Sequence, residues 1–217
     1  MKTRMQNEWI ISPSSPPLYI HKCSKCKKMM PYFCSDKFRL NAQKRTVDVW
    51  LIYKCTKCNN TRNIDILTRV NPKSINSEEY IKFECNNSET AWKYAFDLDI
   101  INKNKVQVDY SEIKYLFSGN ILTLKEIAEQ EVDLIEFEIK VKYNIDFRLA
   151  KLIKSNLNIS NVQLEQMLSN GVITMFPVET NKRSNVMNGQ KIIINREKIC
   201  EYLAKPDDDF KENKNEI

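Results

Sequence analysis

Residues 47–58 read VDVWLIYKCTKC, and this stretch decides the first part of the fold. Apolar residues at every second position of 47–53 predict a strand with one face turned toward a core. The strand leads directly into the pair Cys55-x-x-Cys58, and a matching pair, Cys23-x-x-Cys26, lies earlier in the chain. Two such pairs can bring four thiolates to one point, as a tetrahedral metal ion requires.

The four cysteines Cys23, Cys26, Cys55 and Cys58 are therefore predicted to hold a structural zinc ion. Each CxxC pair can form a tight turn, here called a knuckle, in which both sulfurs face one side. Two knuckles close a four-cysteine shell that has no open position for a substrate, which favours a scaffolding role over catalysis. An iron ion in the same geometry stays open as an alternative. Redox-active dithiols would need a thioredoxin-like βαβ context, and two disulfides would need an oxidising compartment.

We expect a cytoplasmic protein. It does not open with the charged region and apolar stretch of a signal peptide, and its longest apolar runs are far too short to cross a bilayer. The remaining cysteines, Cys34, Cys85 and Cys200, are expected to be buried as small apolar residues in a reducing compartment. The single histidine, His21, is expected to lie beside the metal ligands or at the surface rather than to bind the ion.

Catalysis and nucleotide binding are not expected. Gly119, Gly171 and Gly189 are too far apart to form a phosphate-binding loop or a dinucleotide fingerprint. A single histidine leaves almost nothing for a catalytic triad. The sequence shows no nucleophile setting and no metal site with an open position.

The charge of the chain divides it into four parts. The net charge is +11 over 1–73, −6 over 74–145, +4 over 146–196 and −3 over 197–217. We expect an α+β protein with a four-cysteine zinc ribbon, an acidic α+β connector, a basic C-terminal module and a disordered acidic tail, in that order. Basic parts on either side of an acidic one are compatible with a nucleic-acid partner, although the excess of lysine also reflects an AT-rich genome.

The local patterns predict the elements of the first two parts. Strands are expected over 38–42, 47–53 and 61–70, in an antiparallel ribbon with a hairpin turn at 43–46. In the connector, Ser88 is expected to cap a helix, and Thr123-x-x-Glu126 matches a capping box. Alternation over 135–143 predicts a half-buried strand, with its carboxylates on a solvated face.

The C-terminal module is predicted to contain two short helices followed by a hairpin. Apolar residues at helical spacing give the first helix, and Ser160-x-x-Gln163 is a capping box for the second. Asn170-Gly171 is predicted to end the second helix. Strands are then expected over 172–176 and 191–195.

This order of elements resembles the RNA-binding domain typified by ribosomal protein S-four, over about 50 residues of the chain. The matching residues are Arg148-Leu149, Leu152-Ile153, Leu157-x-Ile159-Ser160, Met167-Leu168, Gly171-x-Ile173 and Asn188-Gly189-x-Lys191-Ile192. Two positions depart from the family pattern: Asn161 stands where the family usually has arginine, and Gly189-Gln190 stands where it has Gly-Asp. The resemblance implies that RNA phosphates are contacted by Arg148, Lys151, Lys154, Lys182 and Arg183. A helix-turn-helix that reads DNA is the alternative for the two helices.

A second resemblance covers most of the chain. It rests on three segments, Phe38-Arg39-Leu40-Asn41-Ala42, Asp48-Val49-Trp50-Leu51-Ile52-Tyr53-x-Cys55-x-x-Cys58 and the preceding Cys23-x-x-Cys26. These segments are similar to a bacterial family known as domain of unknown function 1062. That family carries no established activity, so the resemblance supports the architecture and leaves the function open.

Together these observations predict a cytoplasmic, zinc-containing protein that binds RNA, either a structured RNA or one in the ribosome, without catalysis of its own. The exposed aromatic residues Tyr32, Phe33 and Trp50 are expected to assist. No membrane partner and no nucleotide cofactor are expected. The alternatives are a protein-interaction adaptor, a DNA-binding regulator that uses the ribbon and the two helices, and, less favoured, an RNA-modifying enzyme.

Overall fold

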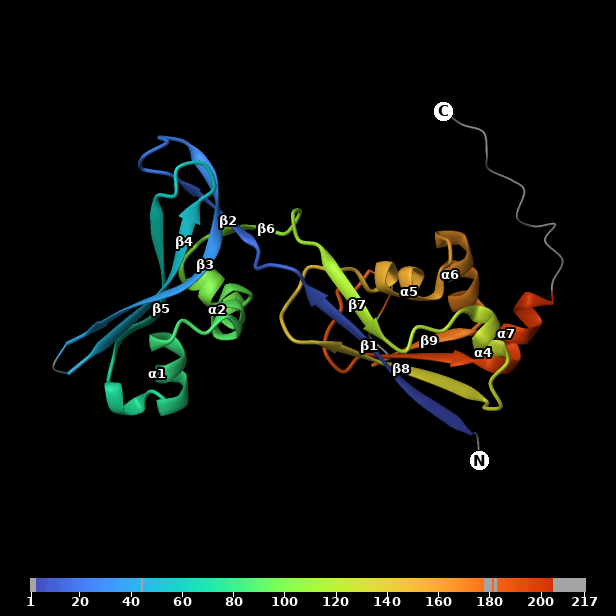
Figure 1. Ribbon diagram of the computed structural model, residues 1–217. Coiled ribbons are helices and arrows are strands. Elements are labelled where there is room, and N and C mark those ends of the chain that lie inside the picture. The colour runs from blue at the N-terminus through green and yellow to red at the C-terminus, as the bar shows by residue number, and fades with distance from the viewer. Residues whose placement is uncertain (1–2, 44, 178–180, 182, 205–217) are drawn as a thin grey trace. The chain divides into compact units, whose positions relative to one another are not determined.

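The computed structural model describes residues 3–43, 45–177, 181 and 183–204. These residues form an α+β protein with two five-stranded sheets and seven α-helices. The chain divides into two compact units (Figure 1). Unit 1 is built from the described parts of 1–11, 117–141 and 146–217, and unit 2 from those of 12–116 and 142–145.

Unit 2 contains an antiparallel sheet with the strand order β5-β4-β3-β2-β6. Its strands are β2 (Leu18–Lys22), β3 (Met29–Ala42), β4 (Val47–Cys55), β5 (Thr61–Val70) and β6 (Gln107–Asp109). The chain between β5 and β6 forms a 3-10 turn and three helices, namely η1 (Pro72–Ser74), α1 (Ser77–Glu84), α2 (Ser88–Ala95) and α3 (Leu98–Lys103). The strands predicted over 38–42, 47–53 and 61–70 are confirmed, and Gln43 N donates to Thr46 O at 2.8 Å across the predicted turn.

The alternation along β4 gives the unit 2 sheet two different faces. Val49, Leu51 and Tyr53 are fully buried and belong to the same core cluster as residues of α1, α2 and α3. Residues at the intervening positions of β4 are half-buried. Because side chains of a strand point alternately to opposite faces, the helices cover one face and the intervening residues lie on the other.

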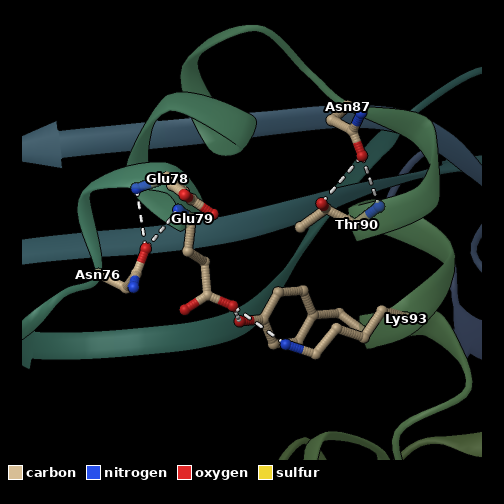
Figure 2. Close-up of polar contacts among 7 residues, drawn as sticks. Asn76, Glu78, Glu79, Asn87, Thr90 and Lys93 are labelled. Atoms are coloured by element: carbon tan, nitrogen blue, oxygen red, sulfur yellow. Dashed lines mark hydrogen bonds and ion pairs between the residues drawn. The ribbon is translucent and has the colours of Figure 1, made fainter.

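Asparagine side chains cap the N-termini of α1 and α2 in unit 2 (Figure 2). Asn76 Oδ1 accepts a hydrogen bond from Glu78 N at 2.8 Å, and Asn87 Oδ1 accepts one from Thr90 N at 2.9 Å. The prediction that Ser88 caps α2 is wrong by one position, since Ser88 is its first helical residue. Asparagine and serine are comparable N-caps, so the sequence alone did not separate them.

One carboxylate joins α1 to α2. Glu79 Oε1 accepts hydrogen bonds from Tyr94 Oη at 2.7 Å and from Lys93 Nζ at 3.1 Å (Figure 2). Burial raises the pKa of Glu79, but the hydrogen bonds from Tyr94 and Lys93 outweigh it, and the net pKa is lowered. The charged form of Glu79 therefore stabilises the helix pair.

Unit 1 contains a mixed sheet with the strand order β7-β1-β8-β10-β9. Its strands are β1 (Arg4–Pro13), β7 (Tyr115–Gly119), β8 (Leu134–Val141), β9 (Ile173–Phe176) and β10 (Lys191–Asn195), with the ends of β1 and β7 belonging to unit 2. Its helices are α4 (Leu124–Ala128), α5 (Leu149–Leu157), α6 (Asn161–Ser169) and α7 (Arg196–Leu203). They lie on one side of the sheet (Figure 1).

The centre of this sheet is a parallel pair of strands that are distant in sequence. β1 pairs with β8 from Arg4↔Leu134 to Ile11↔Val141. Trp9 of β1 is fully buried and stacks on Phe137 of β8, with 4.4 Å between ring centroids. The sequence reading gave no strand over 4–13, because the partner that stabilises this strand is not local.

The strand predicted over 135–143 is confirmed as β8, but the expected exposure of one of its carboxylates is wrong. Glu136 was expected on a solvated face, yet it is only 2% exposed. Arg4 Nη1 and Lys191 Nζ reach its carboxylate at 3.1 and 2.6 Å. A buried charge of this kind is tolerated because it is paired.

The local predictions for the rest of unit 1 are confirmed. The capping boxes at Thr123 and Ser160 both form their reciprocal hydrogen bonds. Gly171 has φ +63°, which suits the end of α6. β9 and β10 pair antiparallel, so the order is helix, turn, helix and hairpin.

The two units differ from the four expected parts, which end at residues 73, 145 and 196. Residues 4–11 lie in unit 1, and α1 to α3, expected in the connector, cover the sheet of unit 2. The tail expected over 197–217 begins inside α7, and its residues 205–217 lie outside the described chain. Long-range strand pairing, which no local pattern encodes, accounts for the difference.

No helix of the described chain is long and apolar enough to cross a membrane.

Candidate metal centre

Two turns with the same geometry hold the four predicted ligands. Residues 23–28 join β2 to β3, and residues 55–60 join β4 to β5. In the first turn, Cys23 N donates to Lys28 O at 2.9 Å, and Lys27 N donates to Cys23 O at 2.8 Å. This pair of hydrogen bonds closes the loop around the first CxxC pair.

The second turn repeats the first. Cys55 N donates to Asn60 O and Asn59 N donates to Cys55 O, both at 2.9 Å. Asn59 has φ 57° and Lys27, its counterpart, has φ 59°. Asparagine adopts this left-handed region readily, whereas lysine does so less often, and such a conformation persists only where the surroundings hold it. A metal ion bound by the cysteines would be a restraint of this kind.

The sulfur atoms converge as a tetrahedral site requires. The four Sγ atoms all lie within 4.8 Å of one another, and Cys23 Sγ lies 3.5 Å from Cys58 Sγ. Metal–sulfur bonds of about 2.3 Å would place tetrahedral ligands about 3.8 Å apart. The amide of Cys26 also donates to Cys23 Sγ at 3.3 Å, a contact that favours a thiolate. These four cysteines could hold a metal ion.

Tyr32 supports the centre from β3. It is 1% exposed and lies opposite Cys55, so the expectation that it is an exposed aromatic is wrong. Its hydrogen bond to the sulfur of Cys23 lowers the pKa of that thiol to about 6, whereas the Cys58 sulfur and burial raise the pKa of Cys26 to about 12. Thiols this close do not all ionise against one another, and a bound cation lets all four act as thiolates.

The surface around the centre is basic. Asp and Glu are absent from residues 9–35 and 49–64. The exposed lysines of the turns and their flanks are Lys22, Lys25, Lys27, Lys28 and Lys57. A divalent ion with four thiolates would carry a net charge of about −2, which these lysines would stabilise.

The other sulfur and imidazole groups lie outside the cluster. The expectation that the remaining cysteines are buried is wrong for Cys85, which is exposed, while Cys34 and Cys200 are half-buried. His21 contacts the guanidinium of Arg62, and burial and that charge lower its pKa. Among the described residues, the group of close ligand atoms contains the four cysteines and not His21.

The RNA-binding residues implied by the first resemblance lie in unit 1. Arg148 and Lys151 are exposed at the first turn of α5, and Arg183 is exposed in the loop between β9 and β10. Arg148 Nη1 donates to Arg183 O at 2.6 Å, which brings the loop to the helix. Lys182 lies outside the described residues.

Lys154 differs from these residues. It is half-buried in the last turn of α5 and donates to the side chain of Asn161 at the start of α6. The structure therefore gathers Arg148, Lys151 and Arg183 at one end of α5 and places Lys154 in the contact between α5 and α6.

Fold and site together define an α+β protein whose second unit carries a four-cysteine centre able to hold a metal ion. The chain belongs to the family described as "Protein of unknown function (DUF1062)", whose model matches residues 40–178. The resemblance to that family is thereby confirmed. The match includes Cys55-x-x-Cys58 and begins after Cys23-x-x-Cys26. No curated protein and no solved structure matches the chain.

Proposed function

We propose that this protein binds RNA through unit 1 and that a zinc ion in unit 2 has a structural role. The observation that carries the RNA-binding part is the cationic cluster at the start of α5, formed by Arg148, Lys151 and Arg183. We call these three residues the α5 cluster.

Helix stability does not account for the α5 cluster. The N-terminus of a helix carries a partial positive charge, which favours acidic rather than basic residues there. α5 has no acidic residue in its first turn, and the side chain of Arg148 makes no capping hydrogen bond. A phosphate group would instead be attracted by the helix dipole and by the basic side chains together.

The loop that carries Arg183 is fixed against α5 by its backbone. Leu149 N donates to Ser184 O at 2.9 Å, and Val186 N donates to Phe147 O at 2.8 Å. The ammonium of Lys151 lies 5.1 Å from the ring centroid of Phe147. The cluster is thus a preformed arrangement, which lowers the entropy lost when phosphates bind. This arrangement supports the resemblance to the S-four type of RNA-binding domain.

The chemistry of the cysteine centre supports zinc. Thiolates are soft ligands, and four of them in a tetrahedron suit zinc or iron. A complete set of four cysteines is the usual form of a structural zinc site and leaves no position for a substrate. The ion would join the β2–β3 and β4–β5 turns, and the residues that hold it act as scaffold rather than as catalyst.

The test is to sequence RNA that is crosslinked to the tagged protein in growing cells, and to measure metal on the same purified sample. We expect enrichment of a structured RNA and one zinc ion per chain. The variant Arg148→Ala/Lys151→Ala should lose the enrichment. With the purified RNA, its plot of log affinity against log salt should be shallower by about 1.8, since each duplex phosphate contact contributes about 0.9.

Lys125→Ala is the matched control, because Lys125 is an exposed lysine of α4 in the same unit. It should leave the enrichment and the salt slope unchanged. A wild-type protein that holds zinc but enriches no RNA would contradict the proposal and indicate a protein-binding scaffold. An α5 variant that binds as wild type would assign RNA binding to other residues.

A further inference from the structure

The face of the unit 2 sheet opposite its helices carries aromatic and basic side chains in neighbouring rows. The register of β3, β4 and β5 defines three cross-strand rows, which are Phe33–Lys54–Thr61, Lys37–Ile52–Asn63 and Arg39–Trp50–Asp65. Directly opposed side chains in a sheet lie close enough to touch. Aromatic rings therefore have basic side chains beside them along this face.

The two aromatic residues of this face are unusual for residues in strands, because neither is fully buried. Phe33 is 38% exposed and Trp50 is half-buried. Among the aromatic contacts of the described residues, neither ring stacks on another ring, whereas Trp9 stacks on Phe137. Neither ring face is therefore occupied by another aromatic ring among the described residues.

The basic residues of the face have no acidic partner in the described part of the chain. Lys37, Arg39 and Lys54 take part in none of its ion pairs. Residues 18–65 contain eleven Lys and Arg but only three acidic residues, Asp36, Asp48 and Asp65, and Asp65 lies beside Trp50 in one of the three rows. One of these acids, Asp48, already accepts a hydrogen bond from Arg69 N at 2.7 Å.

The face also continues into the basic metal centre. Lys54 immediately precedes Cys55, so the row that contains Phe33 lies next to the second CxxC turn. Lys54 lies four positions after Trp50 along β4, which corresponds to about 13 Å at about 3.3 Å per residue. An extended ligand that follows β4 would meet one aromatic ring, then the other, and then the lysines of the turns.

We propose that this face, defined by Phe33, Lys37, Arg39, Trp50 and Lys54 and called the stacking face, binds single-stranded RNA. Bases stack on the two rings, and phosphates contact the three basic side chains. Sequence-tolerant binding of single strands combines these two features, a positively charged track and aromatic platforms. The inference deepens the proposed function by adding a second class of RNA, and it uses residues separate from the α5 cluster.

The test measures the affinity of the purified, zinc-loaded protein for a fluorescent oligouridine of about 12 nucleotides, within the range of single-strand site sizes. Phe33→Leu and Trp50→Leu keep apolar side chains but remove the rings. Each should weaken binding about tenfold, since a stacked base contributes about 1–3 kcal/mol. Phe33→Tyr and Trp50→Phe keep a ring and should bind within about twofold of wild type.

Three results would overturn the inference. They are a wild-type protein that does not bind oligouridine, leucine variants that bind oligouridine as wild type does, and an Arg148→Ala/Lys151→Ala protein that binds a duplex of the same length as tightly as it binds the single strand. Zinc content and circular dichroism show that each variant is folded.

The same experiment separates this inference from the proposed function. Arg148→Ala/Lys151→Ala changes only unit 1, so it should bind oligouridine as wild type does. If that variant loses structured RNA while the leucine variants lose oligouridine, both proposals stand. If only one of these losses is observed, the surface changed in that variant is the one that binds RNA.

Discussion

The uncovered faces of the two sheets carry similar residue types but differ in how their charges are paired. In unit 1, Lys140 Nζ lies 3.7 Å from a carboxylate oxygen of Glu8 and contacts Glu138, and Glu136 is reached by both Arg4 and Lys191. In unit 2, the cations of the stacking face have no such partner among the described residues. A face that neutralises its own charges gains little from a charged ligand, whereas unpaired cations attract one.

The units also differ in what holds them together. Unit 1 is held together by the pairing of β1 with β8, two strands that lie far apart in sequence, and this pairing places Trp9 against Phe137. The pairings of unit 2 are mostly between strands that follow one another, and its two CxxC turns meet at one point. Both units have an apolar core, and we expect a metal ion to add to the stability of unit 2 and buried charge pairs to add to that of unit 1.

The largest expected effect comes from removing a ligand of the metal centre. Cys26→Ser should abolish metal binding and unfold unit 2, because a structural zinc ion contributes on the order of 10 kcal/mol to folding. Native mass spectrometry gives the metal content. Hydrogen exchange should show loss of protection in β2 to β5 and retention of protection in β8 and β10.

Cys85→Ser is the matched control, since Cys85 is an exposed cysteine of the same unit. It should keep the metal ion and the wild-type exchange pattern. Loss of protection in both units of Cys26→Ser would break the comparison, because it would show that they unfold as one.

An intermediate effect is expected from the buried charge of unit 1. Lys191→Met leaves Glu136 with Arg4 alone and should lower the free energy of unfolding by about 2 kcal/mol, less than for a fully buried pair because Lys191 is 34% exposed. Adding Glu136→Gln should recover part of this loss, since the uncompensated charge is removed. Urea unfolding of Lys191→Met, of Glu136→Gln and of the double variant measures the coupling energy between Lys191 and Glu136. If the stability losses of the two single variants add up in the double variant, the two residues do not interact.

The smallest effect concerns the contact between α1 and α2. The pKa of Glu79 is lower in the folded protein than its ordinary value of 4.5, so its contribution is present above that pH and is lost as the pH falls through the folded pKa. Glu79→Gln should lower the free energy of unfolding by about 0.5 kcal/mol at neutral pH and by less near pH 3. Glu84→Gln, at an exposed position of the same helix, should change stability at neither pH. An equal loss for Glu79→Gln at both pH values would contradict the assignment.

Local patterns predicted much of unit 2 and of the metal centre. The alternation over 47–53 gave β4 and its buried face, because strand periodicity is a property of the backbone. The spacing of the cysteines predicted the four residues that could hold a metal ion, because a CxxC turn holds its two sulfurs close together. In unit 1, both capping boxes formed as predicted, since their hydrogen bonds join residues three positions apart.

What depends on distant partners was decided only by the tertiary structure. The strand β1 follows from its pairing with β8, and Glu136 is buried beneath Arg4 of β1 and Lys191 of β10. Tyr32 is buried in the core of unit 2, opposite Cys55. The sequence by itself determined the local elements and the two CxxC turns, because each of these is set within a few residues, whereas the meeting of the two turns depends on the pairing of β3 with β4. The tertiary structure alone decided the two units and the unpaired stacking face, because burial and charge pairing depend on which distant strands meet.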